Sequence, residues 1–172
     1  MKKKALSFYC ITLMLFCQIL LCSGVVGALS ENGANYIADN CAQIKSRLRD
    51  VQHSDSRTRV YLGGYYEKFI SKFITPLNVR LTRNNITDEP APELMSNQAA
   101  FATAQTNFKD DFIDYQKALE DLINADCGNA QDFYTQLVTV REKRQTMVFD
   151  INKLTELTNR HLELVRQLRG RL

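Results

Sequence analysis

The sequence is poor in the residues that build most catalytic and metal sites. It contains only two histidines, and no Cys or His lies at helical spacing from His161, whereas zinc needs three or four ligands. Asp110 and Asp114 lie one helical turn apart, but no Glu-x-x-His motif accompanies them. A glycine-rich phosphate loop and a nucleophile elbow are also absent from the sequence. We therefore expect a protein that is not an enzyme, with no catalytic residues, no metal and no cofactor.

Helix-breaking residues are equally scarce. The three prolines stand at positions 76, 90 and 92, at the edges of patterned blocks, and no internal repeat or low-complexity tract is visible. Proline in a helix interior removes a backbone hydrogen bond, so its position at block edges is compatible with long helices between them. Helical periodicity is therefore the first pattern to test.

The N-terminus has the residue order of a secretory signal. Three lysines at positions 2–4 precede an apolar run from Ala5 to Cys22, and Val26-Gly27-Ala28 supplies the small residues that signal peptidase requires. We expect cleavage after Ala28. The alternative is an uncleaved membrane anchor, because the run approaches the ~18 residues that suggest a membrane span. The remaining chain is then secreted, extracellular or periplasmic, or it is the external domain of an anchored protein.

Removal of residues 1–28 changes both charge and cysteine content. Lys+Arg falls from 22 to 19 while Asp+Glu stays at 19, so the mature chain is formally neutral. A neutral chain gives no reason to expect a nucleic-acid partner. Of the five cysteines only Cys41 and Cys127 remain, and two cysteines in an exported domain predict one disulfide.

The two cysteines constrain the first helical block. In a straight hairpin centred near residue 88, Cys127 lies level with residue 49, so Cys41 overshoots it by eight residues, about 12 Å. A disulfide needs α-carbons within about 7 Å, so an intrachain bond requires the first helix to fold at a break. We favour this arrangement. An interchain bond that makes a covalent dimer is the alternative, and the oligomeric state stays open.

Apolar residues recur at alternating four- and three-residue spacing in three blocks, which is typical of helices that pack along a shared seam. The seam positions are Ile37, Cys41, Ile44, Leu48, Val51, Leu62, Tyr66, Phe69, Phe73, Leu77 and Leu81 in the first block; Leu94, Gln98, Phe101, Gln105, Phe108, Phe112, Tyr115, Leu119 and Leu122 in the second; and Phe133, Leu137, Val140, Arg144, Met147, Ile151, Leu154, Thr158, His161, Val165, Leu168 and Leu172 in the third. The first block loses its spacing in "QHSDSRTR". We therefore predict helices at about 33–52, 56–84, 92–126 and 130–170, with a break at 52–57.

Short connections determine the expected topology. Residues 84–92 combine asparagines with two prolines, and Asn129 is a suitable N-cap for the last helix. Residues 88–132 hold ten acids against two bases, whereas residues 45–83 hold nine bases against three acids. Short linkers and an acidic middle helix between basic ones predict an all-α fold, an elongated up-down-up three-helix bundle of coiled-coil type with an additional N-terminal helical segment.

Two groups of residues are candidates for a protein interface. Tyr61, Tyr65 and Tyr66 surround Gly63-Gly64, and tyrosine is frequent at interfaces. A bent start of the second helix is the structural alternative, because adjacent glycines weaken a helix. Tyr134 and Val138 lie opposite the seam of the last helix, where they either pack under the first helix or mark a partner surface.

The sequence therefore predicts an exported, non-catalytic helical bundle that contacts another protein or the cell envelope. One alternative is a bundle that binds a small hydrophobic ligand or a lipid in a cavity lined by Phe69, Phe73, Phe101, Phe108 and Phe112. The other is the ectodomain of a single-pass membrane protein. The identity of a partner does not follow from the sequence.

Overall fold

The structure is a computed structural model that describes residues 28–170, so the predicted signal segment at residues 1–27 lies outside the described residues. Within the described residues every regular element is helical, which confirms the all-α prediction. The elements are α2 (Glu31–Asp39), α3 (Cys41–Phe69), the π-helix η1 (Ile70–Ile74), α4 (Thr75–Arg83), α5 (Ala91–Asn124) and α6 (Ala130–Arg169).

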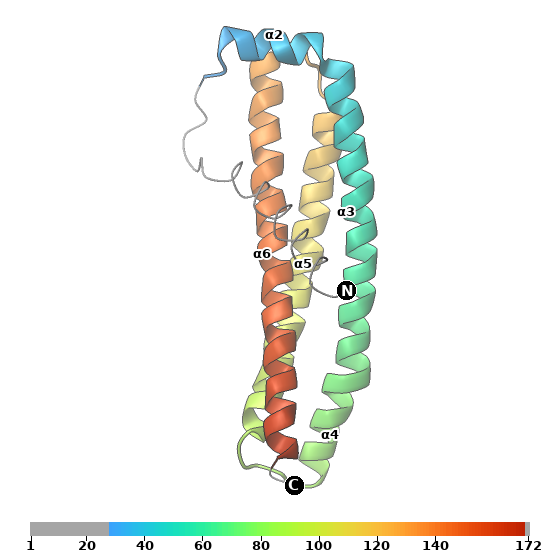
Figure 1. The fold of residues 1–172 in the computed structure, drawn as a ribbon, viewed down its shortest axis with the longest axis vertical. Coiled ribbons are helices and arrows are strands. Elements are labelled where there is room, and N and C mark those ends of the chain that lie inside the picture. The colour runs from blue at the N-terminus through green and yellow to red at the C-terminus, as the bar shows by residue number, and fades with distance from the viewer. Residues whose placement is uncertain (1–27, 171–172) are drawn as a thin grey trace, which may run out of the picture.

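The long helices lie side by side as an elongated bundle, and α2 lies across one end (Figure 1). α5 and α6 are in close backbone contact along their lengths, and α3 also contacts α5 closely. α3 and α6 do not form a comparably close pair, so long side chains bridge them: the Tyr66 hydroxyl lies 3.1 Å from Oγ1 of Thr155, and the Phe69 ring lies 5.8 Å from the ring of His161.

The predicted break at 52–57 is wrong, because α3 runs without interruption from Cys41 to Phe69. The chain bends at Asn40 instead, where φ is −111° and ψ is 15°; both the backbone N–H and Nδ2 of Asn40 donate to the carbonyl oxygen of Tyr36. The loss of apolar spacing had a different cause, since Asp55 occupies the seam position that follows Val51 and is 8% exposed. The predicted break therefore corresponds to a buried charged residue, Asp55, and not to a solvated loop.

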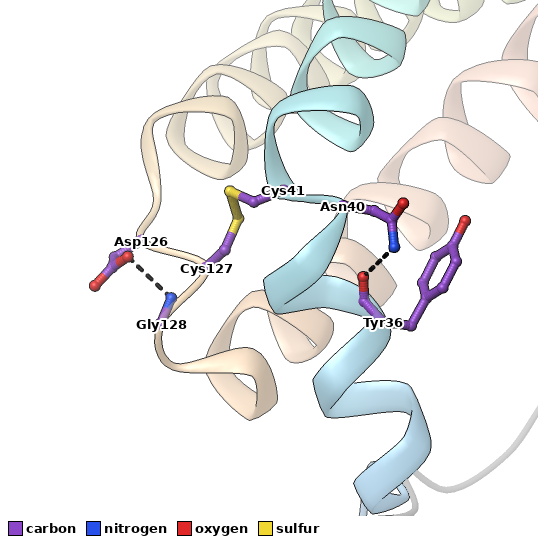
Figure 2. The surroundings of a disulfide bond; sticks show 6 residues. All are labelled: Tyr36, Asn40, Cys41, Asp126, Cys127 and Gly128. Atoms are coloured by element: carbon purple, nitrogen blue, oxygen red, sulfur yellow. Dashed lines mark hydrogen bonds between the residues drawn. A yellow bond between two sulfur atoms is a disulfide. The ribbon is translucent and has the colours of Figure 1, made fainter.

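The disulfide joins Cys41 at the start of α3 to Cys127 in the α5–α6 connection, with α-carbons 5.9 Å apart (Figure 2). It lies within one chain, as favoured from the sequence. The disulfide needs no break in α3, because the hairpin that α3 and α4 form with α5 is centred near residue 85 and not near 88. Asp55 pairs with Tyr115 and Asn78 with Leu94, pairs whose midpoints are 85 and 86, and Cys41–Cys127 has its midpoint at 84.

The π-helix changes which residues of the first block face the core. Pro76 has no backbone N–H, so it cannot continue the α-helical hydrogen bonding, and the wider turn before it absorbs one extra residue. After this insertion Ile74 is fully buried and Phe73 is 63% exposed. The predicted seam position at Phe73 is therefore wrong by one residue, whereas Leu81 returns to the core.

Most of the predicted seam forms the core. On α5 and α6 the buried apolar residues are Ala91, Leu94, Phe101, Ala104, Phe108, Phe112, Tyr115, Leu119, Leu122, Ile123, Phe133, Val140, Met147, Leu154, Leu164 and Leu168. The predicted capping residue of the last helix is confirmed, because Oδ1 of Asn129 accepts from the backbone N–H of Asp132 at 3.3 Å. Pro92 stands in the first turn of α5, where its missing N–H costs nothing.

Gly63 and Gly64 lie inside α3, and the predicted bent helix start at this point is wrong. A Cβ added at either glycine meets no atom within 4 Å. We expect Gly64→Ala to raise the free energy of unfolding by about 0.5 to 1 kcal/mol, because alanine loses less backbone entropy in a helix. Urea denaturation measures this change. Gly33→Ala is the contrast, since its Cβ would lie 2.8 Å from Cδ1 of Leu29, and an equal gain there would contradict the argument.

Candidate contact surface

A buried polar layer crosses the bundle where the seams of three helices meet. Asp55 on α3 accepts hydrogen bonds from the Tyr115 hydroxyl of α5 at 2.7 Å, and from Nε and Nη2 of Arg144 on α6 at 2.8 and 3.0 Å. The bidentate Arg144 contact is charge-assisted and geometrically specific. All three residues occupy seam positions, so the packing of the helices brings them together.

The contacts within the layer shift the pKa of Tyr115 and of Arg144. Burial, reinforced by the Asp55 carboxylate, raises the pKa of Tyr115, so its hydroxyl remains a hydrogen-bond donor. The hydrogen bond to Asp55 raises the pKa of Arg144 further. Both carboxylate oxygens of Asp55 accept hydrogen bonds from these two side chains. The layer is therefore a structural device that fixes how the helices align.

A second polar group lies further along α6. Asp150 is 7% exposed, and its Oδ2 has no hydrogen-bond partner among the described residues. Burial raises the pKa of Asp150 to about 6, and the neighbouring Asp111 on α5 raises it as well. This carboxyl group therefore binds a proton more tightly in the folded chain than in the unfolded chain.

The raised pKa predicts how stability changes with pH. Protonated Asp150 adds to the free energy of unfolding. This contribution is fully present below the unfolded pKa of 3.8 and is lost as the pH rises through about 6. We expect the uncharged Asp150→Asn variant to be more stable than the wild type at pH 7 by about 1 to 3 kcal/mol, and to lose less stability between pH 4 and pH 6. Thermal unfolding across this range measures both. Asp110→Asn, at an exposed position on α5, is the control, and equal curves for wild type and Asp150→Asn would contradict the prediction.

His161 is a core residue in which neither ring nitrogen has a hydrogen-bond partner among the described residues. It is 1% exposed, and its ring meets that of Phe69 edge-on. Burial lowers the pKa of His161, so the ring is neutral at pH 7. The described residues contain no cluster of three or more His, Cys, Asp or Glu that could hold a metal ion.

One side of α6 carries exposed apolar residues toward α3. Val148, Thr155 and Leu162 lie at seven-residue intervals and therefore share one line along the helix. The contact between Thr155 and Tyr66 places this line on the side that faces α3. Val148 is 42% exposed and Leu162 is 39% exposed.

The matching side of α3 and the following π-helix η1 carries aromatic rings. Tyr65, Phe69 and Phe73 follow one another at four-residue intervals, with ring centroids 6.3 and 5.8 Å apart. Phe69 is buried between His161 of α6 and Phe101 of α5. Arg59 lies over Phe112 of α5, and Tyr61 points about 160° away from Arg59 around the helix, so the exposed rings lie on the edge of α3 that is turned away from α5. Tyr61, one turn before Tyr65, extends the line of rings. We call the exposed members of the two lines the α3–α6 face: Tyr61, Tyr65, Phe73, Val148 and Leu162.

The sequence-predicted interface residues divide between the surface and the core. Tyr61 and Tyr65 are 73% and 46% exposed and belong to the α3–α6 face. The inclusion of Tyr66 is wrong, because this residue is 3% exposed and its ring packs on Phe101 of α5. Tyr134 is partly buried against the core, and Val138 is half-buried on α6. Neither belongs to the α3–α6 face.

The phenylalanines predicted to line a ligand cavity do not enclose one together. Phe69 packs on Phe101, Phe108 packs on Phe112, and Phe73 points outward from η1. A shallow groove between α4 and α5 is lined by a different set of residues: Thr75, Asn78, Val79, Thr82, Arg83, Met95 and Gln98. The geometry therefore gives no support to a cavity among the five phenylalanines.

None of the helices in the described part of the chain is both long enough and apolar enough to span a membrane. Comparison of the chain with protein families, with curated proteins and with solved structures finds no match.

Proposed function

We propose that this chain is an exported, non-catalytic bundle of up-down-up topology that acts by binding another protein through the α3–α6 face. The observation that carries the proposal is the contrast between a packed core and the five large apolar side chains of the α3–α6 face, which are among the twelve exposed in the described residues. Large apolar surface that folding leaves in contact with water is typical of binding sites. The tyrosines of this face suit an interface, since each presents an apolar ring and a polar hydroxyl.

Export is the second part of the proposal. It is supported by the order of charged, apolar and small residues at the N-terminus, and by a disulfide of a kind that persists in oxidising compartments. A mature chain that begins at Leu29 retains both disulfide cysteines and every helix described here. N-terminal sequencing of the product in the medium or periplasm tests cleavage after Ala28, and full-length product free in the cytosol would contradict export.

The α3–α6 face is tested with a triple variant, Tyr61→Ser/Tyr65→Ser/Phe73→Ser. The mature wild-type chain, immobilised and incubated with the surface proteins of its producing cells, is expected to retain a specific protein that the triple variant does not retain. The control is Val60→Ser/Ile113→Ser/Phe149→Ser, which removes apolar residues with exposures of 69%, 58% and 68% elsewhere on the bundle. Thermal unfolding verifies that both triple variants fold. Equal retention by the two variants would contradict the assignment of this face.

A further inference from the structure

The α3–α6 face runs along two parallel helices. α3 and α6 run in the same direction, because Asp55 pairs with Arg144 and Tyr66 with Thr155 further along both helices. Their backbones are not in close contact, and side chains fill the space between them. Two parallel helices separated in this way present a linear apolar strip, the surface on which an amphipathic helix packs.

The opposite side of the same pair is already occupied by a helix of defined chemistry. α5 packs its apolar seam against α3 and α6 and carries an excess of acids. Its flanks form ion pairs with α6: Lys143 lies 3.6 Å from Asp114, and Arg160 lies 2.6 Å from Glu93. The bundle itself therefore shows that an acidic amphipathic helix fits between α3 and α6.

The charges beside the α3–α6 face favour a ligand of the same kind. Lys68 follows Tyr61 by seven residues and Lys72 follows Tyr65 by seven, while Arg141 and Arg169 extend the line of Val148 and Leu162 by seven residues at each end. These four cations are exposed and have no ion-pair partner within residues 28–170.

Two acids of this part of α6 form ion pairs within the chain, whereas the exposed Glu142 forms none among the described residues. Glu156 pairs with Lys153, and Glu163 pairs with Arg160. The four cations that extend the apolar strip at seven-residue intervals have no ion pair among the described residues, and they complement an acidic partner.

We infer that the α3–α6 face binds an acidic amphipathic α-helix of the partner protein, which lies along the bundle as a fourth helix. The inference rests on the proposed function and specifies its ligand. The apolar side chains of the partner helix cover Tyr61, Tyr65 and Leu162, and its carboxylates meet the lysines and arginines at the edges. An anionic lipid surface also attracts exposed cations, but the narrow line of apolar residues and the precedent of α5 favour a helix.

Site-specific photo-cross-linking in the producing cells tests the inference. A photoreactive residue is placed singly at Tyr61 or Leu162 on the face, and at Ile113 or Phe149 away from it, where the side chains are 58% and 68% exposed. We expect one protein to be cross-linked from Tyr61 and Leu162 but not from Ile113 or Phe149. Mass spectrometry is expected to place the adduct in a segment with excess Asp and Glu and with apolar residues at helical spacing.

A synthetic peptide of the mapped segment then tests the charges. Lys68→Glu/Arg141→Glu is expected to weaken its binding by about tenfold or more, and added salt to weaken binding to the wild type. The control Arg80→Glu/Lys117→Glu reverses two exposed cations away from the face and is expected to change the affinity by less than about twofold.

The remaining outcomes overturn the inference in distinguishable ways. Cross-links from Tyr61 and Leu162 to lipid, to a second copy of this chain, or to a basic or non-helical segment would show a different occupant. A protein cross-linked only from Ile113 or Phe149 would refute the inference while leaving protein binding as the function. Absence of any cross-linked protein from all four positions would refute both.

Discussion

Replacement of Arg144 by methionine is expected to lower the free energy of unfolding by about 3 to 5 kcal/mol at pH 7, because it leaves a charge without its main partner in the core. Asp55 is 8% exposed and would retain only the hydrogen bond from Tyr115. Methionine conserves much of the apolar volume of the arginine stem, so the loss comes mainly from the unpaired carboxylate. Urea denaturation followed by circular dichroism measures it.

Two further variants separate the effect of the unpaired carboxylate from the effect of removing any arginine. Arg141→Met lies on the same helix, at an exposed position without an ion pair among the described residues, and is expected to change stability by less than about 0.5 kcal/mol. The double variant Asp55→Leu/Arg144→Met removes both charges and is expected to be more stable than Arg144→Met alone. A single Arg144→Met variant as stable as Arg141→Met would show that the layer contributes nothing.

The layer also accounts for the alignment of the helices. A slide of α6 by one heptad would replace Arg144 opposite Asp55 by Leu137 or Ile151, and a slide of α5 would replace Tyr115 by Phe108 or Leu122. Each shift would bury the carboxylate against apolar side chains. Polar residues at seam positions are known to specify register in this way in coiled coils. Apolar seams with a regular repeat tolerate such slides, so this polar layer supplies specificity that they lack.

The ends and inner faces of α5 and α6 could be predicted from the sequence, because most of their seam positions are apolar and their connections contain proline or a capping asparagine. Asp55 could not be found in this way. A charged residue such as Asp55 normally indicates solvent exposure. The four-three spacing from Leu48 and Val51 nevertheless continues through residues 55, 58 and 62. The sequence did contain a signal for this ion pair, because Asp55 and Arg144 occupy seam positions on different helices.

The sequence predicted only two of the five residues of the α3–α6 face, Tyr61 and Tyr65. Tyr61 and Tyr65 lie outside the seam and are exposed, whereas Tyr66 was itself a seam residue, so its burial was already implied by the spacing. Phe73 could not be placed, because the extra residue of the π-helix rotates everything before Pro76 relative to everything after it. The contribution of α6 was also missed, since Val148 and Leu162 become a surface only when α3 lies beside them.

Removal of the disulfide by Cys41→Ser/Cys127→Ser is expected to cost about 2 to 4 kcal/mol and to lower the melting temperature by about 6 to 12 °C. The bond joins residues separated by 86 positions, so it restricts a large loop of the unfolded chain. The loss of structure is expected to be confined to the part of the bundle near the disulfide. α2 is anchored near this bond by few other contacts, among them the burial of Ile37 and the hydrogen bond from the Leu29 N–H to Gln131 at 2.8 Å.

Reduction provides the matched comparison, because the wild type in excess dithiothreitol is expected to unfold at the same temperature as the double serine variant, which dithiothreitol leaves unchanged. Hydrogen exchange is expected to accelerate in α2 and the first turns of α3 in both cases, while amides around Asp55 stay protected, since the polar layer and the α5–α6 packing remain. A double serine variant as stable as the oxidised wild type would contradict this role. A wild-type chain that migrates as a dimer until it is reduced would show that the bond joins two chains.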